Sequence, residues 1–461
     1  MTRRLAVAAV LLGLSALPAA RSQELVAGGE AVMLPSLTLS PRLAQLASPR
    51  LRTELQTIAG VYGERAELRA AATVWHEITD PASADRMEIE PDDPESPDLD
   101  DLQSSGVSLD ELRLRLVPSR WAVVEVGRFR HRVGRAVLLS PNDTYTSVSF
   151  DTVARGDVDA AGTAQTLATA TAFFGSASLT LVAVPVPAVP QLVEPGSIWI
   201  PRLPSDEVID DPRISDDPVP LNEVFAERTR RILEPYRRVS GGAHAGVVAG
   251  PVDLLVFYYH GVDPTPVPRV FVDVAHGRYD LHVVPEEALI DSFGFAAESV
   301  AGSSTIWVDA ALVPNKTIAA TTIDPYSKRS RLKTAPTLAG VAGASYRAGG
   351  LDLLLLGEYY AGHSFLPDGV RADEVVEPVL ANDLLLSARL RAGARSQWSF
   401  VLGGLVSFDD GGSVLSASVA WEPAPAVTAS VQAPVFLGPA DSDFGQYRDI
   451  VHVVSEIRVS Y

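Results

Sequence analysis

Cysteine is missing altogether from this chain, although the chain is 461 residues long. Its absence excludes a disulfide framework, a thiol nucleophile and a thiolate metal site. The fold must therefore be held by ordinary burial or by closure of a sheet. Its stability is expected to be independent of the redox state of the compartment.

Long apolar runs are also lacking. The run from Leu5 to Leu17 is shorter than the about 20 residues that a helix needs to cross a bilayer, and no later run is longer. A helical membrane protein is therefore excluded. Arg3 and Arg4 before this run, and Ala20-Arg21-Ser22 after it, have the pattern of an export signal with a cleavage site. Residues 1–22 are predicted to be a signal peptide.

The chain has no excess of basic residues, since its formal net charge is −19. Nucleic acid is not expected as a partner, because phosphate binding needs a basic footprint. The acidic residues are clustered: ten carboxylates lie between Asp80 and Asp101, and six more between Asp206 and Asp217. These segments are also rich in proline and have little to bury, so they are predicted to be long solvated loops.

What the chain does have is a two-residue alternation of apolar and small polar side chains. Along residues 398–408 one face carries only apolar residues and glycine, with aromatic residues near both ends, and residues 415–421 and 427–435 repeat the alternation. Successive side chains of a strand point to opposite faces. An apolar face with aromatic ends, opposed by Ser, Thr and Gln, is typical of a strand between lipid and a polar lumen. A soluble sandwich is the alternative.

The last strand has the same alternation. Val451, Val453, Ile457, Val459 and Tyr461 share one face, opposite His452, Glu456, Arg458 and Ser460. A final aromatic residue after an export signal resembles the closing strand of bacterial outer-membrane barrels, which the barrel assembly machinery recognises. Ile457, Val459 and Tyr461 are therefore predicted to form an assembly signal.

The predicted fold is all-β: a transmembrane antiparallel β-barrel of about 16 strands, with 14 or 18 possible, since bacterial barrels use even numbers. Residues 23–461 are expected to form this single domain. A plug or periplasmic segment over residues 23–58 is left open, with Leu34 to Ile58 as the part that would fold inside. The one helical pattern runs from Leu221 to Leu233.

The most suggestive charged cluster consists of arginines at alternate positions. If the strand around residue 128 continues regularly, Arg128, Arg130 and Arg132 share one face, and Arg113 and Arg115 share a face of the preceding strand. An arginine facing lipid costs about 2 to 4 kcal/mol at the midplane, so all five are predicted to line the lumen. They would form a basic constriction that selects solutes. Alternatively, they pair with carboxylates such as Glu111 and Glu125 as structural bridges.

The same region resembles a group of Gram-negative porin-like outer-membrane proteins. The matching pieces are Gly127-Arg128, Gly134-Arg135 and the turn Ser140-Pro141-Asn142-Asp143, together with Tyr258 to Pro264 further on. Val133 departs from the group, in which tryptophan is frequent at this place. The resemblance implies a barrel, and it carries over no catalytic residue.

Together these patterns predict a porin-like outer-membrane channel for passive diffusion of small hydrophilic or charged solutes, with lipid, the assembly machinery and solutes as partners. The alternatives are a plugged transporter of apolar molecules and a structural or adhesion barrel. An enzyme is not expected, because no metalloprotease, serine hydrolase or phosphate-loop motif is found. His131 with Ser140 and Asn142 is the one cluster worth testing for catalysis. No cofactor and no metal are predicted.

Overall fold

The computed structural model of the chain describes residues 24–39, 48–63, 65–79, 103–137, 140–148, 162–187, 208–209, 219–220, 224–225, 238–265, 267–275, 278–324, 329–350, 352–366, 382–393, 397–440, 442, 444–448 and 451–460. Within these ranges, no helix combines the length and the apolar composition needed to cross a membrane. Tyr461 and residues 1–22 lie outside the described residues, as does the acidic segment from Asp80 to Asp101.

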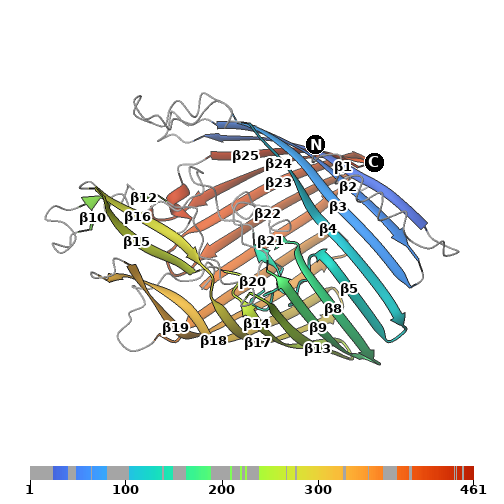
Figure 1. The fold of residues 1–461 in the computed structure, drawn as a ribbon. Helices are drawn as coiled ribbons and strands as arrows, with labels where there is room; N and C mark the ends of the chain where they lie inside the picture. The colour runs from blue at the N-terminus through green and yellow to red at the C-terminus, as the bar shows by residue number, and fades with distance from the viewer. Residues whose placement is uncertain are drawn as a thin grey trace, which may run out of the picture.

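The strands form a closed ring (Figure 1). Of the 21 strands in the main sheet, three stand outside the ring, and the other 18 follow one another in chain order until the last pairs with the first. The ring strands are β1 (Glu24–Leu39), β2 (Ser48–Tyr62), β3 (Ala66–Thr79), β4 (Gln103–Ser119), β5 (Ala122–Phe129), β8 (Gln165–Phe174), β9 (Ala177–Val186), β13 (Ser240–Ala249), β14 (Val252–Val262), β17 (Leu289–Ala301), β18 (Ser304–Asp324), β19 (Arg329–Ala348), β20 (Leu353–Ser364), β21 (Asn382–Ala392), β22 (Trp398–Ser407), β23 (Ser413–Ala424), β24 (Val427–Leu437) and β25 (Val451–Ser460).

Neighbouring ring strands are antiparallel throughout. The three strands outside the ring are β12 (Val224–Phe225), β15 (Val267–Ala275) and β16 (Arg278–Glu286). The prediction of an antiparallel β-barrel is confirmed. The 18 strands of the ring among the described residues stand at the upper end of the predicted range.

The outer face of the barrel is apolar. Leu386, Leu402 and Val435 are between 51% and 61% exposed in mid-strand, where they have no protein neighbour above them. Soluble proteins rarely expose apolar patches beyond a few hundred Å². An apolar belt around a closed antiparallel ring is instead the lipid-facing surface of a transmembrane barrel, since only closed barrels and helices satisfy every backbone polar group in a bilayer.

Aromatic side chains mark both edges of this belt. At one end, the rings of Trp398 and Trp421 stack with centroids 5.9 Å apart. Toward the other end, the rings of Tyr258 and Phe293 lie 5.1 Å apart. Aromatic girdles of this kind sit at the two membrane interfaces, so their positions set the height of the belt.

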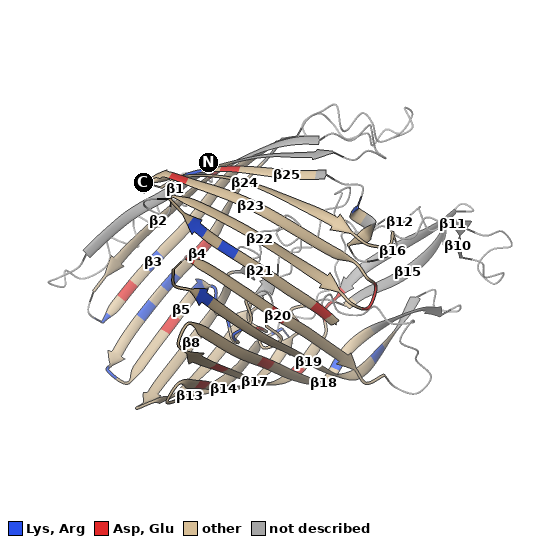
Figure 2. Cartoon of the chain, turned by 180° about the vertical axis from the view of Figure 1, so that it is seen from behind, with Lys and Arg blue, Asp and Glu red and all other residues tan. Residues whose placement is uncertain are grey.

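The two ends of the barrel differ in their connections. At one end, which we call the short-turn end, β4 and β5, β8 and β9, β13 and β14, and β17 and β18 are joined by two-residue turns. At the opposite end the connections are long, and they include residues 130–164 between β5 and β8. Charged residues are sparse along the strands, and on β3 and β4 positions of both signs lie close together (Figure 2).

Two expectations for the chain are corrected by the structure. A plug was considered for Leu34 to Ile58. The described parts of this segment instead belong to β1 and β2, which lie in the wall and pair with each other over their lengths. Val224–Phe225 was expected in a helix and forms strand β12, parallel to β16, while the rest of residues 221–233 lies outside the described part. In the segment from Asp206 to Asp217, only Val208–Ile209 is described.

Candidate functional site

After Phe129 the chain leaves the wall and passes into the barrel. We call residues 130–148 the inner segment, of which 130–137 and 140–148 are described. Val133, Asn142 and Tyr145 are at most 3% exposed. The inner segment contacts inward-facing residues of β13, β14, β18 and β20, and the backbone of Phe295 on β17. Because β20 lies almost opposite β5 in the ring order, the inner segment reaches across the lumen.

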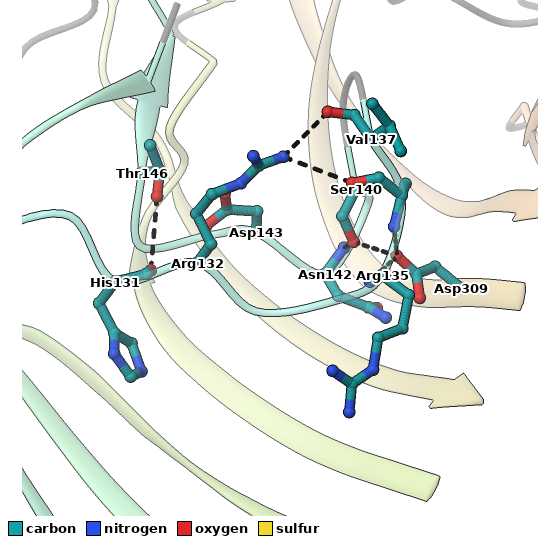
Figure 3. A network of polar contacts seen from close by, with 10 residues as sticks. His131, Arg132, Arg135, Val137, Ser140, Asn142, Asp143, Thr146 and Asp309 are labelled. Carbon is teal, nitrogen blue, oxygen red and sulfur yellow. Dashed lines mark hydrogen bonds and ion pairs between the residues drawn. The ribbon is translucent and has the colours of Figure 1, made fainter. Parts of the chain in front are cut away.

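Asp309 of β18 is the main anchor of the inner segment. Its Oδ2 accepts hydrogen bonds from the backbone N–H of Arg135 at 2.7 Å, from the N–H of Ala136 at 2.9 Å and from Ser140 Oγ at 2.7 Å (Figure 3). The carboxylate is fully buried. Hydrogen bonds to a charged group are the stronger ones, so this contact fixes where the segment crosses.

Gly134 permits this close approach. Its φ of +107° lies in the region that favours glycine, and a Cβ there would lie 1.9 Å from Ser140 Oγ. The turn that presents the N–H groups of Arg135 and Ala136 to Asp309 therefore requires glycine at this position. The glycine that contributes to the family resemblance thus has a physical role.

Glu358 of β20 forms a second anchor. It accepts a hydrogen bond from the backbone N–H of Val137 at 2.6 Å and one from Trp307 Nε1 at 2.8 Å, and Tyr360 donates its hydroxyl to the same carboxylate. The side chain is 1% exposed. A buried carboxylate with three donors is a rigid acceptor, so the inner segment is held at two points on the far wall.

One side of the inner segment is packed into an apolar core. Phe129, Val133 and Tyr145 join buried inward-facing residues of the wall: Leu167, Val182, Val184, Phe257, Tyr259, Ile290 and Ala311. This core lies on the inside of β8, β9, β14, β17 and β18. A barrel of 16 to 18 strands is wide enough to enclose an aqueous channel.

A hollow of about 360 Å³ opens at the turn of the inner segment. It is lined by Arg132, Val133, Gly134, Arg135, Ala136, Val137, Ser140 and Glu298. Arg135 forms ion pairs with Asp253 and, at 3.7 Å, with Glu298, both on the wall. Arg132 pairs with Asp143 at 3.7 Å within the segment. The polar side of the segment thus carries fixed charges of both signs.

The base of the inner segment contains a histidine pair. His131 Nε2 lies 3.3 Å from His244 Nε2, and the His131 ring also contacts the ring of Tyr145, which packs on Tyr259. Burial lowers the pKa of His131 to about 4, with a smaller contribution from His244. A neutral imidazole at this position is therefore part of the folded state.

We expect this pair to make the barrel less stable as the pH falls from about 6.5 to about 4. Over that range the unfolded chain binds a proton at His131, while the folded chain does not, so protons favour unfolding by up to about 3 kcal/mol. The free energy of unfolding in urea, measured across this pH range, checks the expectation.

The control for this measurement is His131→Gln, because burial raises the pKa of Asp143 to about 7 and its titration acts in the opposite sense. Stability gained from protonated Asp143 is lost as the pH rises through 7, with or without His131. The difference between the two proteins isolates the histidine. Parallel pH profiles would contradict the assignment.

Of the predicted arginines, Arg113 and Arg115 are brought together on the inner face of β4. Arg113 lies 3.4 Å and Arg115 lies 3.7 Å from Glu125 of β5, and both reach Glu67 of β3 within 4.0 Å. Arg69 pairs with Glu111 at 3.1 Å in the same patch. The sequence left two roles open for these arginines, free pore charges or structural pairs with Glu111 and Glu125. The contacts are those of structural pairs.

The other three predicted arginines are placed elsewhere. Arg128 is in register with outward-facing Leu112, and its Nε donates to the carbonyl of Leu109 at 2.7 Å. Arg130 and Arg132 follow the end of β5 and belong to the inner segment. The five arginines therefore do not form one patch, because the strand does not continue regularly beyond Phe129, whose side chain turns into the apolar core.

The residues considered for catalysis are not assembled. Ser140 donates to Asp309, Asn142 Nδ2 donates to the carbonyl of Phe295 at 2.9 Å, and His131 faces His244. In the part of the chain that is described, no three His, Asp or Glu side chains come together as a metal site. At the C-terminus, Ile457 and Val459 are 47% and 39% exposed on the outer face. Their role as an assembly signal with Tyr461 stays a prediction.

The sequence analysis missed Asp309 and Glu358. Each is a single carboxylate in the inward row of a strand that otherwise carries apolar or small residues, in Trp307-Val308-Asp309 and Gly357-Glu358-Tyr359. A charge isolated in this way needs a buried partner, which is the signal that could have identified both anchors.

Comparison with known proteins gives structural neighbours only. No protein-family model matches the sequence, and no curated protein is similar to it. Among solved structures, Pseudomonas aeruginosa OccK7 is 9% identical, with 95% of this chain and 98% of that chain covered and a TM-score of 0.47. Salmonella typhi OmpF in complex with daunomycin is 9% identical, with 95% and 97% covered and a TM-score of 0.43. Pseudomonas aeruginosa OpdK with vanillate is 8% identical, with 94% and 98% covered and a TM-score of 0.44.

Proposed function

We propose that the protein is an outer-membrane channel through which small hydrophilic or charged solutes diffuse passively. The observation that carries the proposal is the inner segment, which is fastened to Asp309 and Glu358 across an otherwise wide barrel. A segment held rigidly inside a lumen narrows it to an eyelet, and the width and charge of an eyelet select solutes without any chemistry.

The eyelet lies between the polar side of the inner segment and the facing wall. Arg130 and Arg132 on the segment are the proposed pore charges, and Arg113 and Arg115 on β4 line the lumen as charges paired with Glu125. Arg128 is not among the proposed pore charges, because it is in register with outward-facing Leu112. The proposal includes export by residues 1–22, insertion by the barrel assembly machinery, and short turns on the periplasmic side, as in bacterial barrels.

The test is conductance of the purified, refolded protein in a planar lipid bilayer. Discrete open steps at the single-molecule level, with a stable conductance, are the expected result. Heat-modifiable migration on a gel provides the control that the barrel is folded. Folded protein that never conducts would contradict the channel and would favour the two alternatives, a transporter of apolar molecules or a structural barrel.

A further inference from the structure

Three arginines on the inner wall lie at the short-turn end without a carboxylate partner. Arg389 and Arg391 alternate with Leu386 and Leu390, which are 54% and 37% exposed on the outer face, so both arginines face the lumen. Arg347 of β19 is in register with Leu354 of β20, which is in register with Arg389. All three side chains are exposed inside the pore.

Other arginines of the inner wall are neutralised. Arg69, Arg113, Arg115 and Arg458 each have a carboxylate oxygen within 4.0 Å, at 3.1, 3.4, 3.7 and 2.6 Å respectively. Among the described residues, no carboxylate lies within 4.0 Å of Arg347, Arg389 or Arg391. The contrast marks this group as one whose positive charge is not balanced by a carboxylate within 4.0 Å.

The spacing suits an anion. Alternate residues of a strand are about 7 Å apart, and next-nearest strands are about 10 Å apart. Guanidinium groups remain ionised and are weakly hydrated, so three of them at this spacing attract a carboxylate or phosphate that can contact two at once. The basic positions at the end of β21 are visible in Figure 2.

The facing wall does not cancel this charge. β19 to β21 lie opposite β3 to β5 in the ring order, and there Arg69, Arg113 and Arg115 are balanced by Glu67, Glu111 and Glu125. Asp309, the anchor of the inner segment, is at the same level of the barrel as Asp383 of β21, through the register of Val341 and Tyr360. Arg389 lies further along β21, toward the short turns. The charged group therefore stands between the eyelet and the short-turn mouth.

We infer that Arg347, Arg389 and Arg391 form an anion site that makes the channel prefer solutes bearing carboxylate or phosphate groups. The inference rests on the proposed channel function and names its class of solute. Anions are concentrated at the mouth by the uncompensated arginines, and they leave easily because the site is open to water.

The experiment is the reversal potential of single channels under a potassium chloride gradient, for the wild type and for the double variant Arg389→Gln, Arg391→Gln. We expect the wild type to prefer chloride over potassium. In the variant, the ratio of chloride to potassium permeability is expected to fall about threefold, while the conductance stays similar. The matched control is Arg65→Gln with Arg120→Gln, which removes the same charge from the turns at the same end and is expected to leave the potential unchanged.

Two further arms separate the possible explanations. Arg389→Lys with Arg391→Lys is expected to retain the chloride preference, because it retains the charge. Succinate and inorganic phosphate are then added as blockers, and uncharged succinamide is the comparison. In the wild type, we expect succinate and phosphate to block half of the current at a lower concentration than succinamide does. In the glutamine variant, we expect no such difference. Open channels with equal reversal potentials in wild type and glutamine variant would overturn the inference while leaving the channel intact. A folded wild type that never conducts would overturn both.

Discussion

Replacement of Asp309 with alanine is expected to raise the single-channel conductance by roughly twofold, because the eyelet opens when its anchor is lost. The variant removes the acceptor of three hydrogen bonds and leaves the N–H groups of Arg135 and Ala136 buried without partners. The cost to the attachment of the inner segment is about 3 kcal/mol or more, since buried donors without partners keep their full desolvation penalty. Planar-bilayer recording gives the conductance directly.

Asp309→Asn is the graded control for this result. The amide oxygen can still accept a hydrogen bond, but it lacks the charge that strengthens the contact. We expect an intermediate conductance with larger fluctuations. If the alanine variant is folded and conducts like the wild type, the inner segment does not define the eyelet.

Replacement of Leu402 with arginine is expected to destabilise the barrel by about 2 to 4 kcal/mol, the cost of a guanidinium on the lipid face near the midplane. Leu402 is 61% exposed on the outer face of β22. The free energy of unfolding in urea from lipid vesicles measures the effect. The loss of stability comes from contact between the new guanidinium and lipid, since no protein group covers this side chain.

Gly403→Arg is the matched control, because this neighbour of Leu402 on the same strand faces the lumen and lies opposite Ser387 and Ser416. There the new guanidinium meets water, so little change in the free energy of unfolding is expected. Equal costs for the two variants would contradict the assignment of the faces and, with it, the membrane belt.

The strands near the C-terminus could be predicted from the sequence because each satisfies one local rule. From Trp398 to Phe408 the alternation is uninterrupted, and the lipid and the lumen impose it at every step. β1 was harder to find, since Gly28, Gly29 and Pro35 dilute its alternation. It is a strand because β2 and β25 pair with it, and such long-range pairing leaves no local trace.

The candidate site was predictable only in part. The alternation of Arg128, Phe129, Arg130, His131 and Arg132 looks like a continuing strand, yet the chain turns inward after Phe129. What decides this is a carboxylate at Asp309, 173 residues from Ala136 in the sequence. A hydrogen bond over that separation cannot be inferred from spacing, whereas the pairing of Arg113 and Arg115 with Glu125 followed from neighbouring strands and could be.

The contact between β1 and β25 closes the ring, and it has a kinetic consequence. It joins the two strands that are farthest apart along the chain, so the entropy of loop closure makes this seam the slowest to form. Its ladder is also interrupted between the pair Met33 and Ile457 and the pair Ser36 and Val454, where Pro35 supplies no N–H. A ring that has not yet closed would thus expose β1 and β25 as open edges. These edges are where the barrel assembly machinery, or a second chain by mistake, would add a strand.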